Sequence, residues 1–159
     1  MRPEIYQLEQ TVRFADTDAA GIVYFGMFAT YFDESVISAL REYAISWDRH
    51  IHEHTFLLPI VESHAQFYGP LRAGEEFKVL MAVVKLSKRS FRTEHMILKE
   101  VDGHPKLIAT GYISRVCVDT NNFKPIPITP TLKTALKAHL LSQAAWEEFL
   151  EQTKEIQRR

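Results

Sequence analysis

The segment RFADTDAAGIVYFGMFATYFDES, residues 13–35, decides the fold because a turn and a long helix meet in it. Its first half places Asp16 and Asp18 around a threonine and continues with small residues and Gly21, a composition typical of a tight turn. Its second half starts an apolar repeat at spacings of three and four, which predicts a helix over Phe25–Tyr43 with one buried face. The repeat consists of Phe28, Phe32, Val36, Ala39, Leu40 and Tyr43.

The rest of the chain changes from helical to strand periodicity. A strand over Glu4–Phe14 precedes the turn, and strand-like alternation recurs in segments 58–70, 76–86, 90–101 and 106–118. The segment Val79–Val84 is apolar on both faces, which predicts a strand covered on both sides. Asp102-Gly103 lies between two such runs and predicts a hairpin turn.

The C-terminal region predicts one further helix after a connector punctuated by Pro125, Pro127 and Pro130. It runs over Leu132–Gln157. The predicted inner face of this helix is formed by Leu136, Leu140, Ala144 and Phe149.

This order of elements predicts an α+β fold, with one long central helix against a twisted antiparallel sheet. A doubly wound parallel sheet would need a helix between successive strands, and the sequence has none there. We interpret residues 1–159 as a single domain, with a core over about 4–120 and a helical extension over about 130–157.

Composition limits the possible functions. The chain has 159 residues, 46% hydrophobic residues and a net charge of −1, which gives no argument for nucleic-acid binding. Its single cysteine, Cys117, cannot form an internal disulfide and fits a reducing compartment. The N-terminus lacks the apolar core of a signal peptide, and no stretch reaches the length of a membrane span. We therefore expect a soluble, cytoplasmic protein without membrane or nucleic-acid partners.

Segment 13–35 resembles the signature of hotdog-fold acyl-CoA thioesterases of the 4-hydroxybenzoyl-CoA thioesterase class. In that class a strand, a D-x-D-x-x-G-x-V-[YW] loop and a helix wrapped by the sheet follow one another. The agreement in element order extends from about Tyr6 to Val118. Within the class, the motif VRFADTDAAGIVYF is most similar to the bacterial 1,4-dihydroxy-2-naphthoyl-CoA hydrolases of quinone biosynthesis. The resemblance implies the hotdog fold with an extra C-terminal helix.

The resemblance assigns the catalytic carboxylate to Asp18 rather than to Asp16. An aspartate at a helix start can attack the thioester carbon or take a proton from water, and both roles stay open. The alternative is that both aspartates only cap a turn and a helix. The resemblance also implies that the backbone N–H of Phe25 stabilises the developing oxyanion, and that Gly21 and Tyr24 belong to the substrate-binding loop.

The resemblance implies three further features of a substrate site. Many short-chain members of the class carry histidine where this chain has Phe25, so a histidine-assisted mechanism is excluded and an aromatic acyl group is favoured. Plain core packing is the alternative for the Phe25 side chain. Asp33 matches an aspartate that contacts a substrate hydroxyl group, although a solvated helix position is the alternative. The turn residues Lys88, Arg89 and Ser90 match a nucleotide contact, often made across the subunit interface, and basic turns are also common for solubility alone.

The predicted function is hydrolysis of an acyl-CoA, with an aromatic acyl group favoured, to the free acid and coenzyme A. The site is expected between subunits of a homodimer or homotetramer, and no metal or other cofactor is implied. Two alternatives remain, an aliphatic acyl-CoA or acyl-carrier-protein thioesterase and a non-catalytic acyl-CoA-binding module.

We set aside several other candidates. His50, His52 and His54 alternate but lack other metal-ligand partners, so a solvated loop is favoured. Cys117 lies in a strand pattern and is expected in the core. Trp47 and Trp146 are interpreted as packing residues.

Overall fold

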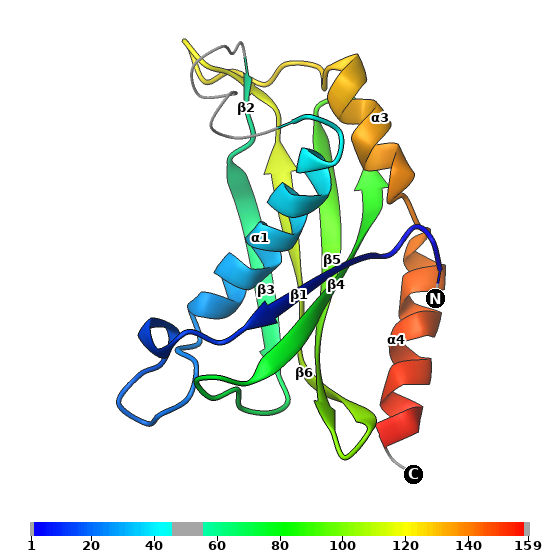
Figure 1. Cartoon of the computed structure of the whole chain (residues 1–159). Helices are drawn as coiled ribbons and strands as arrows, with labels where there is room; N and C mark the ends of the chain where they lie inside the picture. The colour runs from blue at the N-terminus through cyan, green and yellow to red at the C-terminus, as the bar shows by residue number, and fades with distance from the viewer. Residues whose placement is uncertain (1, 46–55, 158–159) are drawn as a thin grey trace.

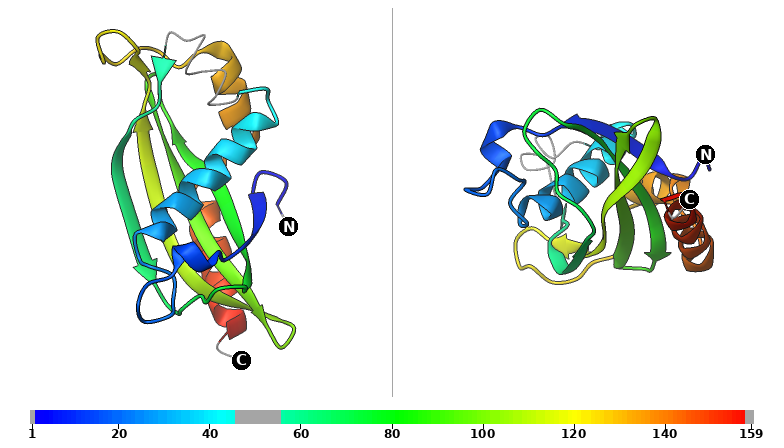
Figure 2. Two further views of the ribbon diagram at one scale, coloured as in Figure 1. Left: turned by 60° about the vertical axis from the view of Figure 1, so that its left-hand side comes forward. Right: turned by 90° about the horizontal axis from the view of Figure 1, so that it is seen from below.

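The computed structural model describes residues 2–45 and 56–157. A curved five-stranded sheet wraps around one helix, α1, and a second long helix, α4, lies on the opposite face of the sheet (Figures 1 and 2). The strands of the sheet, in spatial order, are β1 (Tyr6–Thr11), β4 (Glu76–Leu86), β5 (Ser90–Val101), β6 (His104–Val116) and β3 (Ile60–Phe67), and all neighbours are antiparallel. The other elements are the 3-10 helix η1 (Phe14–Asp16), α1 (Met27–Arg41), β2 (Phe56–Leu57), β7 (Val118–Asp119), α3 (Pro130–Ala138) and α4 (Gln143–Gln157).

This is the hotdog arrangement that the family resemblance implies, and the predicted α+β class is confirmed. The helix predicted over Phe25–Tyr43 is α1, which is two residues shorter at each end. The hairpin predicted at Asp102-Gly103 joins β5 to β6, and both residues have the positive φ angles, 52° and 78°, that a tight two-residue turn requires.

Alternation along β4 explains why this strand is apolar on both faces. Val79, Met81 and Val83 point toward the side that holds α1, whereas Leu80 and Ala82 pack in a separate cluster with Trp146 of α4. The expectation of a strand covered on both sides is therefore confirmed. Burial on both faces holds the centre of the sheet rigidly between the two helices.

The packing of α1 against the sheet depends on Gly111 of β6. A Cβ atom at this position would lie 2.5 Å from the ring of Phe32 and 2.2 Å from the carbonyl oxygen of His64. Glycine is required here because the helix approaches the strand so closely that no side chain fits. The contact fixes the height of α1 over the sheet.

The single C-terminal helix predicted over Leu132–Gln157 is wrong, because the structure divides this region into α3 and α4. Strand β1 pairs with β4 only as far as Met81, and the connecting segment takes over the free edge beyond it. The N–H of Val83 donates to the carbonyl of His139 (2.8 Å), and the N–H of Leu141 donates to the carbonyl of Val83 (2.8 Å). These strand-type hydrogen bonds interrupt the helix.

The inner face predicted for that helix is therefore only partly correct. Leu136 is buried and Phe149 packs in the cluster around Trp146, but Leu140 is 41% exposed and Ala144 is exposed. Helix α4 starts anew after Ser142, whose hydroxyl accepts the N–H of Ala145 (3.2 Å).

Within the part of the chain that the structure describes, strand β3 forms an edge of the sheet and pairs on one side only. Ile60, Val61 and Phe67 are 44%, 61% and 45% exposed, which is unusual for apolar residues of a strand. Within residues 2–45 and 56–157, no helix is long and apolar enough to cross a membrane.

Candidate active site

The loop between η1 and α1 folds back on itself and exposes Asp18 near its tip. Its two limbs pair at Thr17 and Val23, and the N–H of Asp18 donates to the carbonyl of Ile22 (2.9 Å). Gly21 has a φ of 73° and its N–H donates back to the carbonyl of Asp18 (2.9 Å). One carboxylate oxygen of Asp18 accepts the N–H of Ala20 (2.8 Å). The aspartate is thus held by the backbone while its side chain stays exposed.

Asp16 is the opposite case, because it is only 3% exposed and all its interactions are internal. Its carboxylate accepts hydrogen bonds from the guanidinium of Arg13 (Nη2, 2.9 Å; Nε, 3.1 Å) and from the hydroxyl of Tyr31 (2.9 Å). Burial raises the pKa of Asp16, but the hydrogen bonds from Arg13 and Tyr31 outweigh it, so the pKa lies below its ordinary value. The two aspartates of the motif therefore differ in role, with Asp16 buried in the fold and Asp18 available to a ligand.

Asp16 also ties the loop to the start of α1. Its carbonyl accepts the N–H of Tyr24 (2.9 Å), and the N–H of Val23 donates to the carbonyl of Leu71 (2.8 Å). The ring of Tyr24 lies over Gly26, where a Cβ atom would be 2.6 Å from it. The backbone entering α1 is therefore fixed on both sides.

The backbone N–H of Phe25 is an available donor at this helix start. Within the described part of the chain it has no hydrogen-bond acceptor, although the carbonyl of Phe25 accepts the N–H of Phe28 (3.3 Å). Phe25 lies two residues before α1, and the dipole of the helix adds positive potential at this end. The ring of Phe25 is 66% exposed and contacts Tyr24 at 4.6 Å between centroids, so core packing does not explain it.

Asp33 is neither buried nor freely solvated. Its carboxylate is paired with the guanidinium of Arg115 on β6, and its side chain is 32% exposed while that of Arg115 is 4% exposed. The alternative of a solvated helix position is therefore wrong for Asp33. Its contact with a substrate hydroxyl group stays a prediction.

The residues Lys88, Arg89 and Ser90 lie at the other end of the sheet from Asp18. Lys88 and Arg89 lie in the turn between β4 and β5, and Ser90 begins β5. The loop that carries Asp18 follows the end of β1, which pairs with the beginning of β4. The length of β4 separates these ends by about 30 Å, at roughly 3.3 Å per residue. Lys88 and Arg89 are exposed, but one chain does not bring them to Asp18.

Of the candidates that the sequence analysis set aside, the structure describes Cys117 and Trp146. Cys117 is fully buried, and burial raises the pKa of its thiol, as expected of a core residue. Trp146 is 2% exposed and packs between α4 and the sheet. The histidines of segment 50–54, and Trp47, lie outside the described residues. Among the described residues, no group of three or more His, Cys, Asp or Glu is arranged to hold a metal ion.

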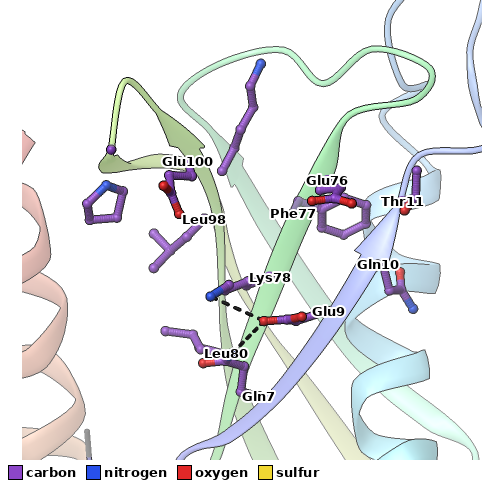
Figure 3. A pocket seen from close by; sticks show the side chains of 13 residues that line it. Gln7, Glu9, Gln10, Thr11, Glu76, Phe77, Lys78, Leu80, Leu98 and Glu100 are labelled. Atoms are coloured by element: carbon purple, nitrogen blue, oxygen red, sulfur yellow. Dashed lines mark hydrogen bonds and ion pairs between the residues drawn. The ribbon is translucent and has the colours of Figure 1, made fainter.

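A separate groove of about 710 Å³ lies on the face of the sheet turned away from α1, between β1 and the β5–β6 hairpin (Figure 3). Its lining mixes apolar and charged side chains, and Lys78 in it pairs with Glu9 at 3.3 Å. None of the predicted site residues lines this groove. We assign it no part in the site.

Sequence reasoning missed Tyr31 and Arg115, which hold the two aspartates Asp16 and Asp33. Tyr31 lies on the apolar face of the predicted helix and gives no separate signal. Arg115 interrupts the apolar alternation of a predicted buried strand, and this was the available signal for a buried ionic contact.

The fold and this loop define a class that comparison with known proteins identifies. The chain belongs to the thioesterase-like superfamily, whose sequence model matches residues 12–136. The 1,4-dihydroxy-2-naphthoyl-CoA hydrolase of Microcystis aeruginosa is 29% identical over 126 residues, which cover 79% of this chain and 88% of that protein.

Two solved structures show the same similarity. The 1,4-dihydroxy-2-naphthoyl-CoA thioesterase from Synechocystis superposes with a TM-score of 0.77 and 27% identity, covering 84% of this chain and 96% of that chain. A gentisyl-coenzyme A thioesterase superposes with a TM-score of 0.71 and 30% identity, covering 82% and 98%. Helix α4 follows the region that the superfamily model matches.

Proposed function

We propose that this protein hydrolyses an acyl-CoA thioester to the free acid and coenzyme A, and that its acyl group is a hydroxylated aromatic ring. The observation that carries the proposal is the loop 16–25. It presents an exposed carboxylate, Asp18, and it ends just before α1 in the N–H of Phe25, which has no acceptor within the described residues. Relatives that act on 1,4-dihydroxy-2-naphthoyl-CoA and gentisyl-CoA support the choice of acyl group.

In the proposed chemistry, the Asp18 carboxylate and the N–H of Phe25 both act on the thioester carbonyl of the substrate. The Asp18 carboxylate either attacks the thioester carbon, giving an acyl-enzyme anhydride that water hydrolyses, or removes a proton from the attacking water. In both routes the carbonyl oxygen becomes negative, and the N–H of Phe25 stabilises it. In both routes the carbon–sulfur bond breaks when this oxyanion intermediate collapses, and the thiolate of coenzyme A leaves and takes up a proton. In the nucleophilic route this departure forms the anhydride, and water hydrolyses the anhydride afterwards.

We further propose that the working unit contains two copies joined through the free edge of β3, either as a dimer or within a tetramer. An unpaired strand edge with exposed Val61 and Phe67 readily adds a second strand. Two copies of β3 related by a twofold axis pair antiparallel, which brings the Asp18 end of one copy toward the Lys88–Ser90 end of the other. This places the basic turn where the phosphates of coenzyme A can reach it. The single, buried Cys117 is consistent with our placement of the enzyme in the reducing cytoplasm.

The test is release of free thiol from a panel of acyl-CoA esters by the wild type, Asp18→Asn and Asp119→Asn. The panel contains 1,4-dihydroxy-2-naphthoyl, 4-hydroxybenzoyl, phenylacetyl, acetyl and palmitoyl esters. Asp119, at the end of β7, is the matched control. Its carboxylate accepts the N–H of Asn121, two residues further along the chain (2.8 Å), just as the carboxylate of Asp18 accepts the N–H of Ala20. Asparagine is also a good cap, so both variants should stay folded.

We expect a hydroxyaryl ester to be preferred, and Asp18→Asn to lower kcat by about a hundredfold or more while Asp119→Asn leaves it unchanged. Equal activity of the two variants would reduce Asp18 to a turn cap. Preference for an alkyl ester would indicate an aliphatic thioesterase, and binding of acyl-CoA without thiol release would indicate a binding module.

A further inference from the structure

Arg115 is a charged side chain buried between α1 and the sheet. Its Nη1 donates to the carbonyl of Leu58 (2.8 Å), and its Nη2 donates to the carboxylate of Asp33. Arg115 lies on β6 opposite Phe91 of β5 and Ile60 of β3, so it reaches α1 from the sheet. The guanidinium is therefore held by the fold on one side and holds the carboxylate of Asp33 on the other.

Stability alone is a poor reason for such a pair. Removing an arginine from water costs free energy, and well-packed apolar residues of similar size often replace buried ion pairs without loss of stability. Burial lowers the pKa of Arg115, and Asp33 acts in the opposite direction. The buried charge of Arg115 and the one-third exposure of Asp33 together indicate that the carboxylate of Asp33 has a functional role.

The helix places Asp33 in line with the proposed oxyanion donor. Ala29 and Asp33 are four residues apart and lie along one side of α1, and Phe25 lies four residues before Ala29, just ahead of the helix start. We call these three residues the stripe, and at about 1.5 Å per residue it is about 12 Å long. Ala29 is exposed and has the smallest side chain of the three, which leaves room above it. A ring-bearing acyl group can span this stripe, whereas an acetyl group cannot.

The stripe faces the open side of the molecule. Tyr31 packs against Phe77 of β4 and bonds to Asp16, so that side of α1 faces β1 and β4. Asp33 is two residues further, roughly opposite on the helix, and contacts β6 instead. The stripe therefore runs toward β6 and the free edge of β3, where a second copy would complete a pocket.

We propose that Arg115 is a positioning residue for substrate selection, which orients the Asp33 carboxylate to accept a hydrogen bond from a hydroxyl group on the acyl ring. This inference rests on the proposed thioesterase function. An ionised carboxylate has about four acceptor sites, so its bond to Arg115 leaves capacity for a ligand.

Such a site discriminates against esters that lack the hydroxyl group. Without that hydroxyl, part of the carboxylate would lose water on substrate binding and gain no hydrogen bond in return. Arginine suits the task because its planar fork fixes the direction of the carboxylate, whereas lysine would supply charge without that geometry.

The experiment compares kcat/KM for 4-hydroxybenzoyl-CoA and benzoyl-CoA, which differ by one hydroxyl group. The enzymes are the wild type, Arg115→Lys, Arg115→Gln, Asp33→Asn and the double variant Asp33→Asn/Arg115→Gln. Arg92→Lys is the matched control, because Arg92 pairs with Glu62 at 2.8 Å on the opposite face of the sheet. Thermal unfolding confirms that each variant is folded. If Arg115→Gln does not fold, the substrate preference of Arg115→Lys, which keeps the charge, tests the inference.

We expect the wild type to prefer the hydroxylated ester about tenfold to a hundredfold, the range of one hydrogen bond to a charged group. Each Arg115 variant should lower that preference about tenfold or more with little change for benzoyl-CoA, and Arg92→Lys should leave it intact. In the double variant, the loss should be no greater than in Asp33→Asn alone, because Arg115 acts through Asp33.

Three results would overturn the inference while the proposed function stands. These are equal use of both esters by the wild type, an unchanged preference in folded Arg115 variants, and an equal loss for both esters, which would make Arg115 only a structural residue. If no ester is cleaved, the proposed function fails instead. The inference is then decided by the dissociation constants of the same two esters, and equal values for the wild type would refute it.

Discussion

Removing the hydroxyl group of Tyr31 tests whether the buried aspartate of the motif organises the catalytic loop. Tyr31 is buried, its hydroxyl donates to Asp16 at 2.9 Å, and its ring packs against Phe77 at 4.7 Å. The variant Tyr31→Phe keeps the ring and deletes one hydrogen bond to a charged acceptor. Asp16 then depends on Arg13, whose side chain is 64% exposed and whose ion pair is screened by solvent.

The expected loss follows from these contacts. A hydrogen bond to a buried charge contributes about 1.5–3 kcal/mol, whereas solvent screens the exposed Arg13 contact and makes it much weaker. We therefore expect the free energy of unfolding of Tyr31→Phe to fall by about 1.5–3 kcal/mol, measured by urea denaturation at pH 7. Because Asp16 also binds the N–H of Tyr24, the loop should loosen, and kcat should fall about tenfold to a hundredfold with little change in KM.

Tyr6→Phe is the control, since the Tyr6 hydroxyl also joins β1 to α1 but bonds to neutral Ser38 at 2.8 Å, away from the loop. We expect it to cost about 0.5–1.5 kcal/mol and to leave kcat unchanged. If Tyr31→Phe loses no more stability than Tyr6→Phe, the hydroxyl does not support Asp16. If it loses the stability but keeps its kcat, Asp16 does not position the loop.

Two further predictions concern stability. Gly111→Ala should destabilise the fold by about 1–3 kcal/mol or more, because its Cβ would lie 2.2 Å from the carbonyl of His64, whereas Gly69→Ala meets nothing closer than 3.5 Å and should be nearly neutral in the same denaturation assay. His95 is fully buried between Ser35 and Thr93, and burial lowers its pKa from 6.5 to about 3. The unfolded chain therefore binds a proton between these values that the folded chain does not, so stability should fall with decreasing pH from about 6.5, by at most about 1.4 kcal/mol per pH unit. Burial raises the pKa of Glu94 to about 6, which acts on stability in the opposite direction. The measurement is therefore the slope of unfolding free energy against pH in the wild type compared with that in His95→Gln. Equal slopes would contradict the prediction.

Local patterns were sufficient to predict most elements of the fold. The apolar repeat around Phe32 and Val36 predicted α1, and alternation predicted the main strands, because both periodicities are set by neighbours in the sequence. The break between α3 and α4 was missed because its cause lies far away in the chain. Val83 offers an unpaired backbone edge that His139 and Leu141 occupy, and no local signal reports that edge.

In the candidate site, too, the local features were predicted and the contacts between distant residues were not. Gly21 and the two aspartates predicted a tight turn at a helix start, and the turn was found there. That Asp16 is buried and Asp18 exposed depends on Tyr31 and Arg13, which the motif alone does not rank. The partner of Asp33 is 82 residues away on β6, so only the folded sheet could reveal it.

Helix α1 connects the proposed chemistry to the proposed selectivity as one rigid element. The N–H of Phe25 lies just before its first residue, and Tyr31 of the helix holds the loop through Asp16. Asp33 follows on the side that faces β6 and the edge of β3. Gly111 lets the whole helix pack closely on β6, so these groups keep fixed distances from one another. Because Asp33 is eight residues from Phe25, substitutions there can change which ring is accepted without moving the oxyanion donor. The same rigidity explains why a loosened loop should lower kcat rather than alter the choice of substrate.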